Sequence, residues 1–162
     1  MAYNAASKDI LTQKYAAPPA PLGVPVKYKG AKFVCVLSKD TITLGMCVAF
    51  KAGVDPALYQ VTRHDKTSTT TCGLAMGFAC ASNVTGEYFF VQVAGPEVDV
   101  SPTLITDTNI AANQMIVPDS ATDGSVRPGT LGTDDHLRMG NAVDADSGAN
   151  LNNYILFDRF SL

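Results

Sequence analysis

Hydrophobic positions in the central part of the chain follow a period of two, the spacing of a β-strand. In TITLGMCVAF, residues 41–50, large side chains alternate with small or polar ones. GLAMGFACA, residues 73–81, repeats this alternation, and EYFFVQVAG follows after a turn at residues 83–86. Strands of this kind bury one face, so we expect ten large side chains to be buried: Leu44, Met46, Val48, Leu74, Met76, Phe78, Phe89, Val91, Ile155 and Phe157.

Further short strands are spread along the rest of the chain, and turn-rich segments separate them. Turn residues gather in KAGVDP, RHDKTSTTT, PDSATDGSVRPG and DADSGAN. A βαβ fold would need helical patterns of about ten residues between strands, and only TLITDTNIAAN at residues 103–113 offers a weak one. The spacing therefore predicts an all-β domain over residues 27–162, built as a small β-barrel or β-sandwich.

One face of the GLAMGFACA strand consists of Gly and Ala, which is not suited to contact with solvent. Such a face indicates close approach by another strand, sheet or subunit, so we expect Gly73 and Gly77 to be packing positions. The pattern LxMGxA at residues 74–79 recurs at residues 137–142, which adds Gly140. Each copy precedes a turn and an aromatic-led strand. This predicts a duplicated hairpin that helps to close one barrel, with chance similarity as the alternative.

The first 26 residues differ from the rest, because four prolines fall within eight positions. Proline favours extended backbone, and SKDILTQKY ahead of the prolines allows a short helix with Ser7 as its N-cap. We interpret residues 1–26 as an extended arm that leaves the domain and packs on a partner, with a disordered tail as the alternative. The domain is then expected to fold without residues 1–22. The expected contacts of the arm are Tyr3, Ile10, Leu11, Tyr15, Pro18, Pro19 and Pro21.

The charged residues are few and unevenly distributed. They make up 17% of the chain, against roughly 25% in an average globular domain. Residues 1–96 hold nine Lys or Arg and five Asp or Glu, whereas residues 97–162 hold three and ten. Folding either mixes these charges on one surface or produces two faces of opposite sign, suited to a charged partner or to head-to-tail docking. The scattered basic residues and the net charge of −3 disfavour nucleic-acid binding.

Targeting and membrane signals are not expected in this sequence. No run approaches the roughly 18–20 consecutive apolar residues of a membrane helix. The N-terminus, MAYNAASKDILTQKY, lacks a basic region followed by an apolar one, so we expect no secretory signal.

The candidate catalytic residues do not form a recognisable motif. His64 lies in the polar segment RHDKTSTTT and could pair with a neighbouring Asp, but no GxSxG motif accompanies it. His136 follows two Asp residues and lacks a second ligand cluster. We therefore expect no enzyme. The alternative is a cellular β-barrel binding module or small hydrolase with a pocket near His64 or His136.

Metal and cofactor motifs are equally weak. Asp144-x-Asp146-x-Gly148 resembles the start of a calcium loop, but it departs from the EF-hand spacing and suits a hairpin turn better. The four cysteines lie in apolar runs without CxxC pairs, so we expect buried reduced thiols rather than zinc ligands. They are Cys35, Cys47, Cys72 and Cys80. We expect neither a metal nor a cofactor.

Three segments, taken in order, resemble the decoration, or cement, proteins of tailed-phage capsids. They are LGMCV at residues 44–48, GLAMGFA at residues 73–79 and GEYFFVQVAG at residues 86–95, with a weaker echo in residues 137–160. The resemblance implies a structural virion protein, assembled in the host cytoplasm, on the outer capsid surface. There it would bridge neighbouring major capsid protein subunits, often as a trimer. It implies no catalytic residues. A tail or fibre protein of the same virion is a further alternative.

Overall fold

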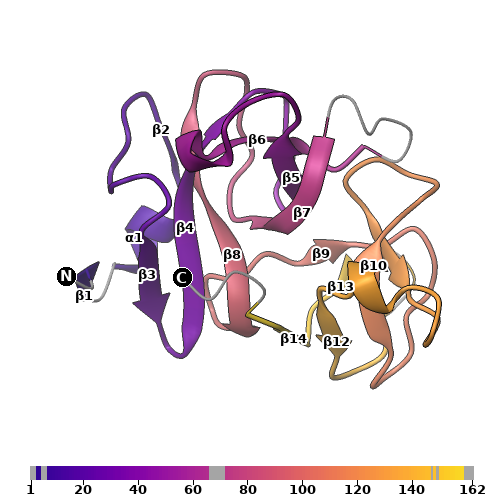
Figure 1. Ribbon diagram of the computed structural model, residues 1–162. Helices are drawn as coiled ribbons and strands as arrows, with labels where there is room; N and C mark the ends of the chain where they lie inside the picture. Colours follow the sequence, from indigo (N-terminus) through magenta and orange to yellow (C-terminus); the bar gives the residue numbers. More distant parts are fainter. Residues whose placement is uncertain (1–2, 5–6, 66–71, 147, 149, 159–162) are drawn as a thin grey trace.

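Strands dominate the computed structural model, which describes residues 3–4, 7–65, 72–146, 148 and 150–158 (Figure 1). Its helical elements are α1 (Lys8–Leu11) and two 3-10 turns, η1 (Pro56–Leu58) and η2 (Asp135–Leu137). None of the helices in these ranges is long and apolar enough to cross a membrane. The strands are β1 (Tyr3–Asn4), β2 (Lys14–Tyr15), β3 (Pro25–Tyr28), β4 (Ala31–Ser38), β5 (Cys47–Lys51), β6 (Gln60–Arg63), β7 (Cys72–Ala79), β8 (Tyr88–Pro96), β9 (Leu104–Ile105), β10 (Met115–Pro118), β11 (Val126–Pro128), β12 (Gly140–Ala142), β13 (Asn150–Leu151) and β14 (Tyr154–Leu156).

Strands β4 to β8 close into a five-stranded barrel. Their order is β4-β6-β5-β7-β8. The last strand, β8, also pairs with the first, β4, along its length, and this pairing closes the barrel. The interior is filled mainly by β-branched and aromatic side chains, among them Val34, Val48 and Phe89, together with Met76. These are residue types that pack well on pleated strands. The prediction of a small all-β barrel is therefore confirmed.

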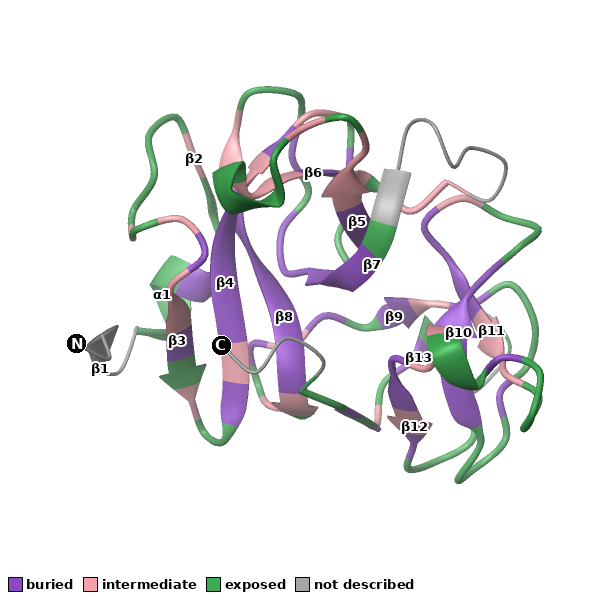
Figure 2. Cartoon of the chain, viewed as in Figure 1, coloured by how far each residue is buried: buried purple, intermediate pink, exposed green. Residues whose placement is uncertain are grey.

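The outer surface of the barrel is also covered, on two sides. The N-terminal segment (residues 7–24) and the β3 strand lie over β4 and β8, where Leu11, Phe33 and Phe90 are fully buried. Residues 103–158, which we call the C-terminal lobe, cover β5 and β7 around Phe78 and Tyr154. Figure 2 shows β4 and β8 buried along most of their length. Burial on both faces explains why β4 and β8 carry apolar side chains on both sides, with Val34 and Phe89 inside the barrel and Phe33 and Phe90 outside it.

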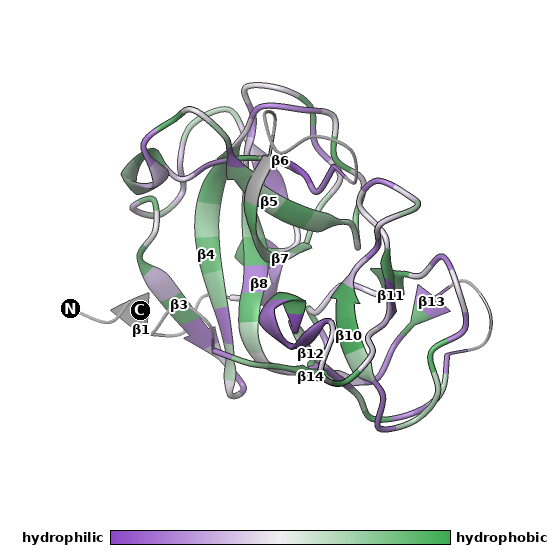
Figure 3. Ribbon diagram, turned by 45° about the vertical axis from the view of Figure 1, so that its right-hand side comes forward, coloured by the Kyte–Doolittle hydropathy of each residue, from purple (hydrophilic) through white to green (hydrophobic). Residues whose placement is uncertain are grey.

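The C-terminal lobe extends the sheet beyond the barrel. The strand order continues from β8 through β14, β12 and β10 to β11, and β9 pairs separately with β13. Figure 3 shows that β4, β5 and β10 are mostly hydrophobic, and most of their residues are buried. A buried polar contact joins the two parts. The Tyr154 hydroxyl lies 2.7 Å from the carbonyl oxygen of Pro102 and 3.0 Å from Oε1 of Gln92 on β8.

The Gly positions of the repeated LxMGxA pattern are sites of close backbone approach within one chain. A β-carbon at Gly77 would collide with the carbonyl oxygen of Gln92 on β8, and one at Gly140 with that of Ile155 on β14. The two hairpins, β7–β8 and β12–β14, meet through the β8–β14 pairing. Gly73 lies in β7, and its surroundings are outside the described residues.

Half of the predicted core is correct. Val48, Met76, Phe78, Phe89 and Val91 are buried, and Met46 is half-buried. The period-two expectation is wrong for four side chains, which are 38–52% exposed: Leu44, Leu74, Ile155 and Phe157.

Local irregularities explain these four errors. Leu44 lies in a turn at Gly45, whose φ is 85°, so β5 begins only at Cys47. The β5–β7 register shifts twice, between Val48 and Ala49 and between Ala49 and Lys51. The first shift places Met76 inside the barrel and Phe78 against the lobe, because a bulge reverses the face of the residues beyond it. The second shift lies next to Leu74, so this side chain does not follow the period of two. Ile155 and Phe157 alternate with the buried Tyr154 and Leu156 and so lie on the outer face of β14.

Phe78→Ala should destabilise the fold by about 3–5 kcal/mol, because it leaves a cavity between β7 and the lobe. Leu74→Ala, on the same strand but half exposed, should cost less than about 0.5 kcal/mol. Urea unfolding of both variants measures the difference. Equal losses would contradict the register of β7.

Candidate docking surfaces

The N-terminal segment is part of the folded domain, which corrects the expectation of an arm that leaves it. Leu11 is fully buried, and β2 pairs with β8 through Lys14 and Phe89. An ion pair of 3.0 Å joins Lys14 to Glu87, and Lys8 lies 3.9 Å from Asp99. Exposed ion pairs contribute little, so burial of Leu11 on the barrel is the main stabilising contact.

The seven predicted contact residues of the arm therefore have different environments. Leu11 is buried and Tyr15 is half-buried, with its hydroxyl donating to the carbonyl oxygen of Ile10 at 2.8 Å. Tyr3 pairs with Val26 through its backbone, and its side chain is outside the described residues. Partner binding stays a prediction for the exposed members of the set, which are Ile10, Pro18, Pro19 and Pro21.

An open groove of about 540 Å³ lies between the N-terminal segment and the barrel, and we call it the N-terminal groove. Leu44, 47% exposed, is its most prominent apolar side chain. Lys29 and Lys8 hold the Asp99 carboxylate on the rim, and the hydrogen bond from Lys29 lowers the pKa of Asp99. The lining residues are Thr12, Gln13, Lys14, Leu44, Cys80, Ala81, Ser82, Asp99, Val100, Ser101, Pro102 and Thr103.

A second apolar surface lies on the C-terminal lobe. Ile155 and Phe157 face outward from β14, and the guanidinium of Arg138 stacks 4.6 Å from the centre of the Phe157 ring. Arg138 also lines a groove of about 440 Å³ together with Leu131, which is 78% exposed. Exposed apolar side chains grouped in this way are typical of protein contact surfaces.

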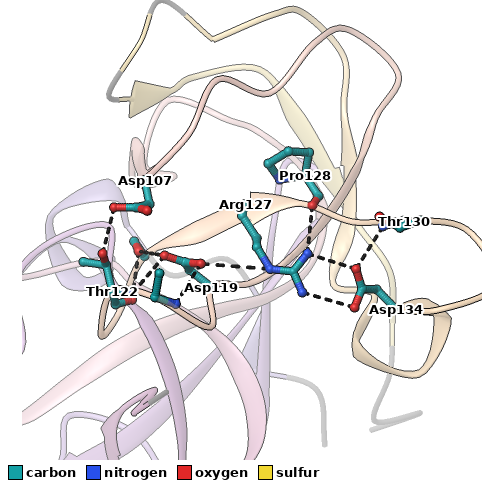
Figure 4. Close-up of polar contacts among 9 residues, drawn as sticks. Asp107, Asp119, Thr122, Arg127, Pro128, Thr130 and Asp134 are labelled. Carbon is teal, nitrogen blue, oxygen red and sulfur yellow. Dashed lines mark hydrogen bonds and ion pairs between the residues drawn. The ribbon is translucent and has the colours of Figure 1, made fainter. Parts of the chain in front are cut away.

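A partly buried ion pair between Arg127 and Asp134 holds the loop that follows β11, next to this surface (Figure 4). The guanidinium of Arg127 donates to both carboxylate oxygens of Asp134, at 2.9 and 3.1 Å, and the Thr130 amide donates to the same carboxylate. Together they lower the pKa of Asp134 from 3.8 to about 2. Asp119 caps the neighbouring turn by accepting the amides of Ala121 and Thr122. These hydrogen bonds and the ion pair give the loop a defined shape.

The histidines named in the alternative function occupy different positions. His64 is half-buried, and burial lowers its pKa. A cavity of about 200 Å³ beside it is lined by Asp40, Thr62, Arg63 and Asp65, not by His64. His136 is exposed in η2. Among the described residues, neither His64 nor His136 lines this cavity or the two grooves described above.

The sequence predicts no metal site and four buried, reduced thiols. Within the described ranges no group of three or more His, Cys, Asp or Glu side chains could hold a metal ion. Cys35, Cys47 and Cys80 are buried and reduced, and burial raises the pKa of Cys35 to about 11 and that of Cys80 to about 12. Thiols with such pKa values are poor nucleophiles at neutral pH. The Cys72 side chain is outside the described residues.

Comparison with known proteins gives only a weak structural likeness. No known protein family and no curated protein matches the chain. The chain is similar to the solved structure of the head fiber gp8.5 N base of bacteriophage phi29, with 13% sequence identity and a TM-score of 0.49. The match covers 78% of this chain and 93% of that one. A likeness of this size assigns no function to the chain.

Leu11→Ala should destabilise the domain by about 2–5 kcal/mol, because Leu11 fills a site between α1 and the outer face of the barrel. Its neighbour Ile10 is 39% exposed, so Ile10→Ala should cost less than about 0.5 kcal/mol. Thermal melting of both variants tests the correction. If both melt like the wild type, the segment contributes nothing to the fold.

Asp134→Asn should lower stability at neutral pH, because it removes the Arg127 pair. The pKa of Asp134 is depressed in the folded state, so its contribution is present above about pH 4 and is lost as the pH falls towards 2. The difference between wild type and variant in urea unfolding should therefore shrink over this range. Asp135→Asn, at the exposed neighbouring position, is the matched control. A difference that is independent of pH would contradict the pair.

Proposed function

We propose that this chain is a structural protein of a tailed-phage virion that binds the outer capsid surface and cements neighbouring major capsid protein subunits. The three segments that resemble decoration proteins support it, because they contribute to β5, β7 and β8, which are adjacent strands of one barrel. The resemblance thus concerns a contiguous part of the fold.

The N-terminal groove is the single observation that carries the proposal. Leu44 is exposed in this groove, in the turn at Gly45, and hydroxyl and charged groups beside it can form a polar rim. Protein contact sites combine an apolar centre with such a rim. The proline-rich part of the N-terminal segment lies exposed in the same half of the molecule and enlarges the surface available to a capsid subunit.

Cementing also requires more than one contact surface, because each copy must hold at least two neighbours. The chain has a second apolar surface on the C-terminal lobe, around Phe157 and Leu131. A trimer, as in the resembling proteins, would supply further contacts and is part of the proposal.

Binding to undecorated capsids tests this function. The wild-type chain should decorate them, and Leu44→Asp should lower occupancy at least about tenfold, since it places a charge at the centre of the groove. Leu58→Asp is the matched control: Leu58 is 50% exposed and lies on η1, outside the groove, so occupancy should be unchanged.

Three results are decisive. Wild-type chain that leaves capsids bare would refute the proposal as a whole. If the wild type and Leu44→Asp decorate capsids equally, the proposed function stands, but the capsid contact lies outside the groove. A capsid that is no more resistant to heat when decorated would argue against a cementing role.

A further inference from the structure

Arg138 is a cation of the C-terminal lobe that the fold leaves without a carboxylate. Residues 103–158 hold two arginines and no lysine. Arg127 forms an ion pair with Asp134, whereas Arg138 forms none within the described part of the chain. A guanidinium stays charged at neutral pH and carries five N–H donors, so Arg138 is suited to bind an anionic group from outside.

Two contacts fix the orientation of the Arg138 side chain. Its guanidinium stacks 4.6 Å from the centre of the Phe157 ring, and Nη2 donates to Oδ1 of Asn141, on β12, at 2.9 Å. Nη1 has no partner among the described residues, and it is not one of the enclosed atoms. A guanidinium that is already held in place loses less rotamer freedom when it binds a ligand.

The groove of about 440 Å³ that Arg138 lines presents mainly hydrogen-bond donors. Its lining contains no Asp or Glu. The side-chain oxygens of two lining amides are already used, because Oε1 of Gln114 accepts the Ala111 amide at 2.7 Å and Oδ1 of Asn141 accepts Arg138. The NH2 groups of these two amides, like Nη1 of Arg138, are therefore left for a ligand that accepts hydrogen bonds.

A carboxylate is the acceptor that suits this set of donors. It can take two N–H groups of one guanidinium at once, and such charge-assisted hydrogen bonds are roughly twice as strong as neutral ones. Leu131, which is 78% exposed, lines the same groove together with Met115. The groove thus matches an acidic side chain that stands beside an apolar one on the partner surface.

The negative charge around the groove narrows the choice of partner. Residues 103–158 contain eight Asp against two Arg, a formal net charge of −6. This charge repels a broadly acidic surface, so a carboxylate is favoured only where it enters the groove itself. Such an arrangement suits recognition of one defined carboxylate rather than general electrostatic adhesion.

We propose that the groove at Arg138 binds an Asp or Glu side chain of the major capsid protein. This inference rests on the proposed function and adds the chemistry of the partner at the second apolar surface. Arg138 supplies the charge, the two amides orient the carboxylate, and Leu131 covers the apolar neighbour of the acidic residue.

A soluble carboxylate tests the groove without a capsid. N-acetylglutamate is added to the isotope-labelled full chain at constant ionic strength, and N-acetylglutamine is the matched neutral probe. N-acetylglutamate should shift the side-chain NH2 resonances of Gln114 and Asn141, with half-saturation at about 10–100 mM, as expected for a single charged contact. N-acetylglutamine should not shift them, and neither probe should do so in Arg138→Gln. Equal shifts with the two probes, or unchanged shifts in the variant, overturn the proposal.

Undecorated capsids test the source of the carboxylate. Arg138→Gln should bind them at least about tenfold more weakly than the wild type. Arg138→Lys keeps the charge without the planar pair of donors and should recover only part of the loss. The matched control is Lys27→Gln, which removes one positive charge at an exposed position of β3, and it should bind like the wild type. Melting temperatures establish that every variant is folded.

The outcomes separate this inference from the proposed function. If the wild type and Arg138→Gln decorate capsids equally, the inference is overturned and the proposed function stands. An equal loss in Lys27→Gln also overturns the inference, because net charge then explains the effect. If the wild type leaves capsids bare, the proposed function fails and the capsid is not the source of the carboxylate. The titration with N-acetylglutamate then still decides whether the groove prefers a carboxylate.

Discussion

Strand β8 is the constraint on which the rest of the structure depends. One edge of β8 pairs with β4 along its length and closes the barrel. The other edge is shared by three partners in succession: β2 at Tyr88 and Phe89, β7 at Val91 and Gln92, and β14 at Gly95 and Pro96. Through this edge the N-terminal segment, the barrel and the C-terminal lobe are all hydrogen-bonded to one strand.

Burial on both faces of β8 follows from this arrangement. Phe89 and Val91 face the barrel interior, whereas Phe90 faces the N-terminal segment. Gln92, which is polar and fully buried, is satisfied by the Pro96 carbonyl and the Tyr154 hydroxyl. A buried polar group without such partners would cost free energy, so these contacts also select the position of the lobe. The lobe and the N-terminal segment are thus parts of one folding unit rather than appendages.

The candidate functional regions of this folded unit are its surfaces. The N-terminal groove includes hydroxyl groups and the paired charges of Lys14 and Asp99, whereas the second apolar surface, on the C-terminal lobe, exposes Leu131, Ile155 and Phe157. Under the proposed function, two unlike surfaces let one copy contact two different neighbours.

The sequence by itself determined the all-β class, the hairpin that becomes β7 and β8, and the close approach at Gly77 and Gly140, because these depend on local alternation and on the space for a β-carbon. It also identified the excess of acidic residues in the second half. Only the tertiary structure decided which face of each strand is inside, since the bulge in β7 and the turn at Gly45 interrupt the period of two. It likewise decided the place of Leu11. A helix of four residues cannot signal what it packs on, and its site is formed by Phe33 and Phe90, far away along the chain.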